Sequence, residues 1–158
     1  LGKAPKLDVS DTSSKQKILK ENVSLLEVFK ISASWDSISS EWVKNYPITF
    51  DIGYPYLTEQ LRETKDVNTS TVQTFLKILS EVPDTLIARK AGLQTADDVS
   101  AQAKQTLEAG GLTTPKGRKE LWKLDRKLRD PNNQLNPGAT ADLTAATLNL
   151  ATLNGYRP

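Results

Sequence analysis

Residues 70–80 read STVQTFLKILS, and this stretch carries the clearest structural signal in the chain. Its large apolar residues recur at the spacing of one buried helix face: Val72, Phe75, Leu76 and Leu79. The stretch therefore predicts an amphipathic α-helix, which Pro83 then interrupts because proline cannot continue the backbone hydrogen bonds. No pair of alternating strands stands beside it, so the fold is expected to grow from helices.

The segment before this helix carries its own start and stop signals. Ser24 and Glu27 form a capping box, which predicts a helix that begins near Leu25. A second helix is expected over residues 38–45. It should end there, because Pro47 disfavours a helical conformation for the residue before it, Tyr46. Residues 46–57 mix proline and glycine with aromatic residues, and we expect helix or irregular structure there rather than a lone strand.

Three helices are expected after Pro83, each with glycine or proline at its end, and the first two with a cap residue at the start. They are residues 95–109, which open at Thr95 and close at Gly110-Gly111; residues 114–130, which open at Thr114-Pro115 and end at Pro131; and residues 140–154, which stop at Gly155.

The six or seven expected helices, with no alternating pair of strands, predict an all-α multi-helix bundle in a single domain. The chain has 158 residues, of which 37% are hydrophobic and 25% charged, and this is typical of a folded globular protein. No apolar run approaches the roughly 20 residues that span a bilayer, so the sequence excludes a membrane protein. We expect a cytoplasmic protein.

The side-chain inventory excludes several kinds of chemistry. With no Cys and no His, the chain has no disulfide, no thiolate metal site and no histidine proton shuttle. A net charge of +2 argues against a nucleic-acid partner. The chain lacks Met and starts at Leu1-Gly2, so we expect a processed chain or the carboxyl-terminal part of a longer protein.

The helix expected over residues 114–130 sorts its side chains into three groups. Leucines form a buried stripe, and a solvated face lies opposite it: Lys119, Lys123, Arg126 and Lys127. One edge of the stripe carries Arg118, Trp122, Asp125 and Arg129. This edge is either the rim of a cleft or the place of an ordinary surface ion pair between Asp125 and Arg129, and the sequence favours neither.

Asp142 stands out in the last expected helix. It falls in line with apolar residues on the face that we expect to be buried, together with Ala146, Asn149, Leu150 and Leu153. A buried carboxylate needs a cation, a metal ion or hydrogen-bond donors. The alternative is that Asp142 only complements the helix dipole at a partly wet end.

Two further groups could contact anions. The loop Asn136-Pro137-Gly138 opens a helix, whose free amides attract phosphate, although it is also an ordinary turn. Asp84 is followed by Arg89 and Lys90, which could bind phosphate, or could simply satisfy the dipole of a short helix.

Three motifs together resemble the triphosphoribosyl-dephospho-coenzyme A synthase family, and archaeal members most closely. They are PDTLIARKAG at 83–92, LDRKLR at 124–129 and NPGATADLTA at 136–145, with a weaker match at SASWDSI, 32–38. The resemblance covers nearly the whole chain, residues 1–158, but only the carboxyl-terminal part of the family's domain. It implies that an amino-terminal part of the same protein completes the fold.

The resemblance implies an all-helical transferase that moves the triphosphoribosyl group of ATP to the 2′-hydroxyl of 3′-dephospho-CoA and releases adenine. It also implies Mg²⁺. A relative with a different ribosyl acceptor, or a nucleotide-binding helical module without turnover, are the alternatives.

The same resemblance implies roles for individual residues. Asp84 and Asp142 would be catalytic and contact the metal, around one hollow of polyphosphate size. The substrate-binding residues would be Arg89 and Lys90 at the triphosphate, Asn136, Gly138 and Thr140 at a phosphate or ribose, and Asp125 with Arg129 as a brace.

Overall fold

The structure, a computed structural model, describes residues 23–157. All regular structure in that range is helical, which confirms the all-α class. The chain divides into two compact units, Leu1–Asn45 and Tyr46–Pro158, and each is described separately. Whether they form the single domain expected from the sequence stays a prediction. No helix within residues 23–157 is both long and apolar enough to cross a membrane.

The first unit contains α2 (Leu25–Ser32) and α3 (Ser37–Lys44). The capping box is formed as predicted, because the Glu27 amide donates to Ser24 Oγ at 3.3 Å and the Ser24 amide donates to Glu27 Oε2 at 2.7 Å. Asn45 ends α3 in the left-handed conformation, two residues before Pro47. Phe29 and Trp42 stack between the two helices with ring centroids 5.7 Å apart.

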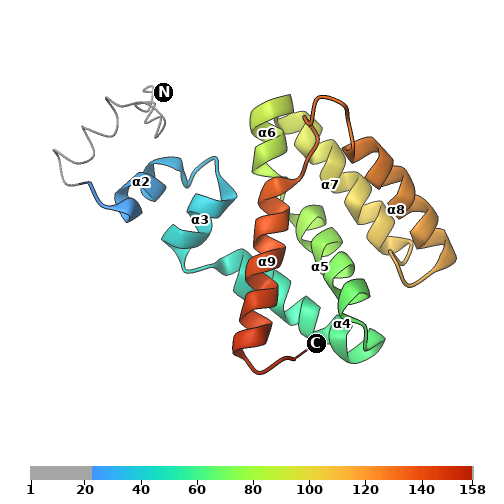
Figure 1. Cartoon of the computed structure of the whole chain (residues 1–158). Helices are drawn as coiled ribbons and strands as arrows, with labels where there is room; N and C mark the ends of the chain where they lie inside the picture. The colour runs from blue at the N-terminus through green and yellow to red at the C-terminus, as the bar shows by residue number, and fades with distance from the viewer. Residues whose placement is uncertain (1–22, 158) are drawn as a thin grey trace. The chain divides into compact units, whose positions relative to one another are not determined.

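The second unit wraps its helices around α5 (Figure 1). Its elements are the π-helix η1 (Ile48–Gly53), α4 (Tyr54–Thr64), α5 (Val67–Glu81), α6 (Thr85–Ala91), α7 (Leu93–Glu108), α8 (Pro115–Leu128) and α9 (Gly138–Leu153). Helix α5 packs against α4, α7 and α9. Residues 48–57 are helical and not a strand, within the expectation of helix or irregular structure, because η1 runs directly into α4.

The core of the second unit forms along the predicted face of α5. Leu76 and Leu79 are fully buried, and Val72 and Phe75 pack against the same cluster from its edge. Helices α6, α7 and α8 contribute the other buried members, which are Ile87, Ala96, Val99, Ala103 and Leu124. The predicted leucine stripe of α8 therefore faces the core.

Three predicted helix starts are late, because α5 begins at Val67 and α9 at Gly138 rather than near Ser70 and Thr140, and the start predicted for α7 is also wrong. Helix α7 begins at Leu93, and Thr95 is not its cap, because Thr95 Oγ1 donates to the Ala91 carbonyl at 2.8 Å. Gly92 has φ of 93°, a left-handed conformation that costs glycine little and lets α7 start directly after α6. Thr114 caps α8 as predicted and accepts a hydrogen bond from the Gly117 amide at 2.9 Å.

Two glycines allow helices to approach closely. A Cβ on Gly117 would collide with the backbone of Gly111, which fixes the start of α8 against the preceding turn. A Cβ on Gly53 would collide with the side chain of Thr147, where η1 crosses α9. These contacts set the positions of α8 and α9, the two helices that carry most of the predicted site.

Candidate functional site

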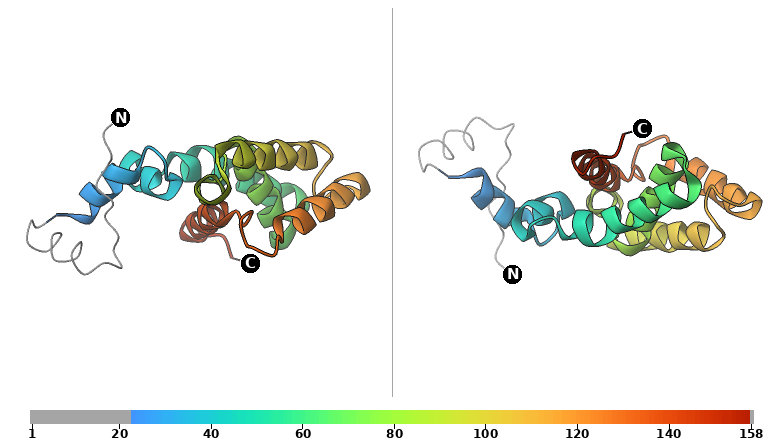
Figure 2. Two further views of the ribbon diagram at one scale, coloured as in Figure 1. Left: turned by 90° about the horizontal axis from the view of Figure 1, so that it is seen from above. Right: turned by 90° about the horizontal axis from the view of Figure 1, so that it is seen from below.

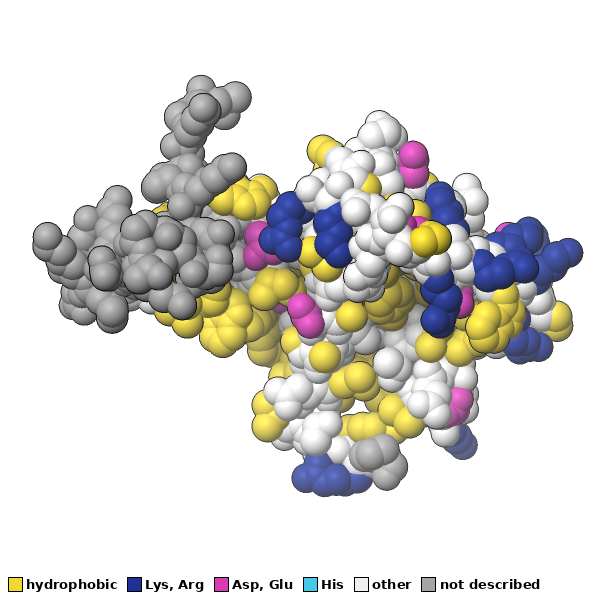
Figure 3. Space-filling model, turned by 45° about the horizontal axis from the view of Figure 1, so that its top comes forward, with side chains coloured by type: hydrophobic (Ala, Val, Ile, Leu, Met, Phe, Trp, Pro, Cys, Tyr) yellow, Lys and Arg dark blue, Asp and Glu magenta, His cyan; other side chains and the backbone are white. Residues whose placement is uncertain are grey.

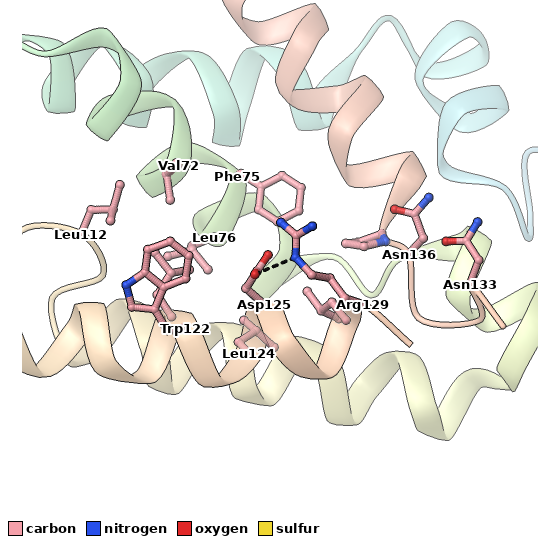
Figure 4. Close-up of a pocket in the computed structure, with 13 residues that line it drawn as sticks. Val72, Phe75, Leu76, Leu112, Trp122, Leu124, Asp125, Arg129, Asn133 and Asn136 are labelled. Carbon is pink, nitrogen blue, oxygen red and sulfur yellow. Dashed lines mark hydrogen bonds and ion pairs between the residues drawn. The ribbon is translucent and has the colours of Figure 1, made fainter. Parts of the chain in front are cut away.

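A pocket of about 590 Å³ opens between α5, α8 and the loop that joins α8 to α9 (Figure 4). Most of its lining is apolar and comes from α5 and α8. Its lining residues are Val72, Phe75, Leu76, Leu112, Leu121, Trp122, Leu124, Asp125, Leu128, Arg129, Asn133, Asn136 and Pro137.

One edge of α8 supplies the polar wall and the aromatic rim. Trp122, Asp125 and Arg129 lie along this edge and line the pocket, and the alternative surface ion pair between Asp125 and Arg129 is formed as well. Trp122 is 61% exposed at the mouth. Arg118 does not line this pocket, and its Nη1 donates to the Leu112 carbonyl at 2.8 Å.

Asp125 and Arg129 form an ion pair one helical turn apart. Arg129 Nε donates to Asp125 Oδ2 at 2.8 Å, and this hydrogen bond holds the pKa of Arg129 above its ordinary value. Within the described residues, the terminal nitrogens of this guanidinium have no protein partner. The Phe75 ring lines the same pocket (Figure 4). A guanidinium held in this way can donate two parallel hydrogen bonds to a phosphate.

The loop from Asp130 to Pro137 forms the far wall of the pocket. Asp130 organises it, because Oδ1 accepts from the Asn132 amide and Oδ2 from the Leu135 amide, both at 2.9 Å. Lys90 Nζ donates to the Asn133 carbonyl at 2.9 Å. Lys90, predicted as a phosphate ligand, therefore fastens this loop to α6.

The pH dependence of this loop can be predicted from Asp130. The hydrogen bond from Leu135, followed by those from Asn132 and Gln134 and the charge of Lys90, holds the pKa of Asp130 below its ordinary 3.8. The ionised Asp130 carboxylate therefore stabilises the loop fully above pH 3.8. This stabilisation is lost as the pH falls through the lower pKa that Asp130 has in the folded protein. In an NMR titration, the Leu135 amide shift should change with a midpoint below 3.8. A midpoint at or above 3.8 would contradict this, and Asp130→Asn should abolish the step.

Asp84 lies outside this pocket, in the interior of the second unit. It is the N-cap of α6 and is 1% exposed. Its Oδ1 accepts from the amides of Leu86 and Ile87 at 2.9 and 3.1 Å. Its Oδ2 accepts from the Thr140 amide and hydroxyl at 2.7 and 2.8 Å. A carboxylate has about four acceptor positions, so these donors fill it.

Asp84 thus ties the start of α6 to the start of α9. Gly138 assists, because a Cβ there would approach Leu86 Cδ2 to 2.6 Å. Thr140 is 1% exposed and faces the protein interior. The catalytic and metal-binding roles of Asp84, and the substrate contacts of Gly138 and Thr140, stay predictions, while the observed contacts of all three are structural.

The expectation that Asp142 is buried in this chain is wrong. Its side chain is exposed, as are those of Asn149 and Leu153. The buried face of α9 instead carries Ala139, Thr140, Leu143, Thr144, Thr147 and Ala151. Because successive helical residues are about 100° apart, Asp142 points away from the side on which Thr140 meets Asp84. The two carboxylates are therefore not brought together around one hollow.

Three of the predicted residues do meet in one place, since Asp125, Arg129 and Asn136 all line the pocket. Sequence reasoning missed two other lining residues. Phe75 was assigned wholly to the core, although it lies at the edge of the apolar stripe, and Asn133 had no distinguishing signal. Arg89 is exposed, and its predicted contact with triphosphate is untested.

Comparison with known proteins places these features in a family. Residues 1–158 match the protein-family model described as ATP:dephospho-CoA triphosphoribosyl transferase. A "probable 2-(5''-triphosphoribosyl)-3'-dephosphocoenzyme-A synthase" of Stutzerimonas stutzeri is 32% identical over 103 residues, which are 65% of this chain. The 2-(5''-triphosphoribosyl)-3'-dephosphocoenzyme-A synthase of Klebsiella pneumoniae is 32% identical over 93 residues, 59% of this chain.

A solved structure shows the same arrangement of helices. The crystal structure of a "putative triphosphoribosyl-dephospho-coA synthase" from Archaeoglobus fulgidus superposes with a TM-score of 0.73 and 27% identity. The superposition covers 95% of this chain and 61% of that one. The chain spans about a third of the curated relatives, 35% of the Stutzerimonas protein and 30% of the Klebsiella protein. The match along the whole chain shows that it belongs to the ATP:dephospho-CoA triphosphoribosyl transferase family.

Proposed function

We propose that these residues form part of an enzyme that transfers the triphosphoribosyl group of ATP to the 2′-hydroxyl of 3′-dephospho-CoA and releases adenine. The observation that carries the proposal is the family match over residues 1–158. The pocket supports it, because an aromatic and apolar hollow next to a guanidinium suits a nucleotide, whose flat base and charged phosphates need different surroundings.

In this proposal the base and the phosphates of a nucleotide bind to different parts of the pocket. Trp122 and Phe75 provide flat apolar surfaces against which a base can lie. Arg129, held by Asp125, donates to phosphate oxygens. Asn133 and Asn136 offer amide groups to ribose hydroxyls across the pocket. The base that accepts the proton of the attacking hydroxyl would be a carboxylate, and Asp84 and Asp142 are both candidates for it.

We also propose Mg²⁺ as a cofactor that arrives with the triphosphate. The residues of the described range do not fit a resident metal site, because they contain no group of three or more acidic side chains that could hold an ion. Mg²⁺ commonly binds through substrate phosphates with only one or two carboxylates. No step is assigned to the metal here.

The whole enzyme in this proposal includes family polypeptide outside these residues and is cytoplasmic. ATP and dephospho-CoA are its substrates, and neither nucleic acid nor a membrane is a partner. The support for further polypeptide is the partial coverage of the relatives.

Adenine release tests the proposed reaction directly. ATP is incubated with the longest polypeptide that the gene encodes, with and without dephospho-CoA, and free adenine is measured by chromatography. We expect release that requires dephospho-CoA. Adenine release with another ribosyl acceptor but not with dephospho-CoA would show that the proposed acceptor is wrong. Binding of ATP without any adenine release would replace the reaction with simple nucleotide binding.

A further inference from the structure

Helix α9 does not segregate apolar and polar residues as a surface helix normally does. Its buried side packs against η1, α4, α5 and α6. Its opposite side carries Ala141, Asp142, Ala145, Asn149, Thr152 and Leu153, here named the outer face of α9, and all six are exposed. Leu153 is 76% exposed, and Asp142 is the only charge on this face. A face with small residues, an exposed leucine and a single charge can accommodate a second covering layer.

The outer face lies at the edge of the second unit. In both views of Figure 2, α9 is seen nearly end-on beside α5 and is not enclosed by the other helices of that unit. Four cations line one surface of α8, Arg118, Lys119, Lys123 and Arg126. Figure 3 shows further Lys and Arg side chains in separate places on the molecule. The outer face itself carries no Lys or Arg.

A groove continues the outer face toward α5. Its volume is about 320 Å³, and its lining contains no charged side chain. Ala141, Ala145 and Leu148 line it from α9, and Val72 and Phe75 line it from α5. Val72 and Phe75 also line the nucleotide-sized pocket, so a polypeptide in this groove would lie directly beside that pocket. Because Ala141 and Ala145 have small side chains, the backbone of a bound polypeptide can approach α9 closely.

We propose that the outer face of α9 and this groove are the docking surface for the family polypeptide that lies outside these 158 residues. That polypeptide exists in relatives, since this chain covers only 61% of the Archaeoglobus chain. It would present an apolar helix to the alanines and a Lys, Arg or amide donor to Asp142, because a carboxylate covered by protein needs such a partner.

A second copy of this chain fits the same surface less well. A symmetric contact through the outer face would bring together only residues of that face, and none of them is a cation that could compensate Asp142. The covering polypeptide would also place Asp142 in a protected site, as its sequence pattern suggested. The proposal rests on family membership and not on the proposed reaction.

The test compares Ala145→Arg in the longest polypeptide that the gene encodes and in the 158-residue chain. We expect the midpoint of thermal unfolding, Tm, to fall by about 5–10 °C in the longer polypeptide and by less than about 2 °C in the shorter one. Ala101→Arg is the matched control, because Ala101 is an exposed alanine within α7, and it should change neither Tm.

A milder variant keeps the test valid if Ala145→Arg prevents folding. Leu153→Ala removes only apolar atoms that are exposed in this chain, so Tm should fall by about 2–5 °C in the longer polypeptide alone. Since Tm is the readout, adenine release can fail or succeed independently of the result.

Other results would overturn the proposal. An equal fall of Tm in both polypeptides would mean that another part of this chain already packs on the outer face of α9. A dimer of the 158-residue chain in sedimentation that Ala145→Arg dissociates would assign it to a second copy. If Tm of the longer polypeptide does not change, no further polypeptide packs on this face. If the gene encodes nothing beyond these residues, the proposed polypeptide does not exist.

Discussion

Replacing Asp84 with Ala is expected to lower the free energy of unfolding by about 3–5 kcal/mol, the sum of a lost helix cap and lost buried hydrogen bonds to a charged group. The carboxylate accepts from Leu86, Ile87 and both donors of Thr140 at 1% exposure. Without it, those donors stay buried without partners, and the starts of α6 and α9 are no longer joined. Urea unfolding followed by circular dichroism measures the loss.

Asp66→Ala is the matched control for this variant. Asp66 also caps a helix, since it accepts from Asn68 and Thr69 at the start of α5, but it is exposed and joins no second helix. Its loss should cost about 1 kcal/mol. If Asp84→Ala unfolds at the same urea concentration as the unaltered protein but no longer releases adenine, Asp84 is catalytic, as the sequence suggested.

Replacing Arg129 or Trp122 with Ala is expected to weaken ATP binding by about tenfold or more for each variant. A charge-assisted hydrogen bond contributes roughly 1.5–3 kcal/mol, and stacking of a base on an aromatic ring roughly 1–3 kcal/mol. Both side chains line the pocket, and Trp122 is 61% exposed at its mouth. Neither is buried in the core, so the variants should fold normally. Calorimetric titration of ATP into the longest polypeptide of the gene measures Kd.

Arg126→Ala provides the comparison. It removes the same kind of cation from the same helix, but Arg126 faces away from this pocket, and the Kd for ATP should stay within about twofold. Equal weakening by Arg126→Ala and Arg129→Ala would mean that general positive charge on α8, and not the pocket, attracts the nucleotide. An unchanged Kd for ATP in the Trp122 and Arg129 variants would mean that ATP does not bind in this pocket.

Local signals in the sequence were sufficient for most helix ends. Ser24 and Thr114 cap their helices as predicted, because a cap depends on residues two or three positions away. The prediction at Thr95 failed because Gly92 takes a left-handed conformation, which lets α7 start earlier than the pattern of Thr95 and Asp98 suggested. The edge of α8 that carries Asp125 and Arg129 was also predictable, because a regular helix fixes which side chains share a face.

The sequence by itself determined the all-α class, the core face of α5, the rim residues of α8 and, through its motifs, the family. Only the tertiary structure decided the roles of the acidic residues. Helical periodicity gives the angle of a side chain about its own axis but not which neighbour packs there. Asp84 was therefore found buried against Thr140, and Asp142 exposed on α9, because burial depends on contacts between segments distant in the chain.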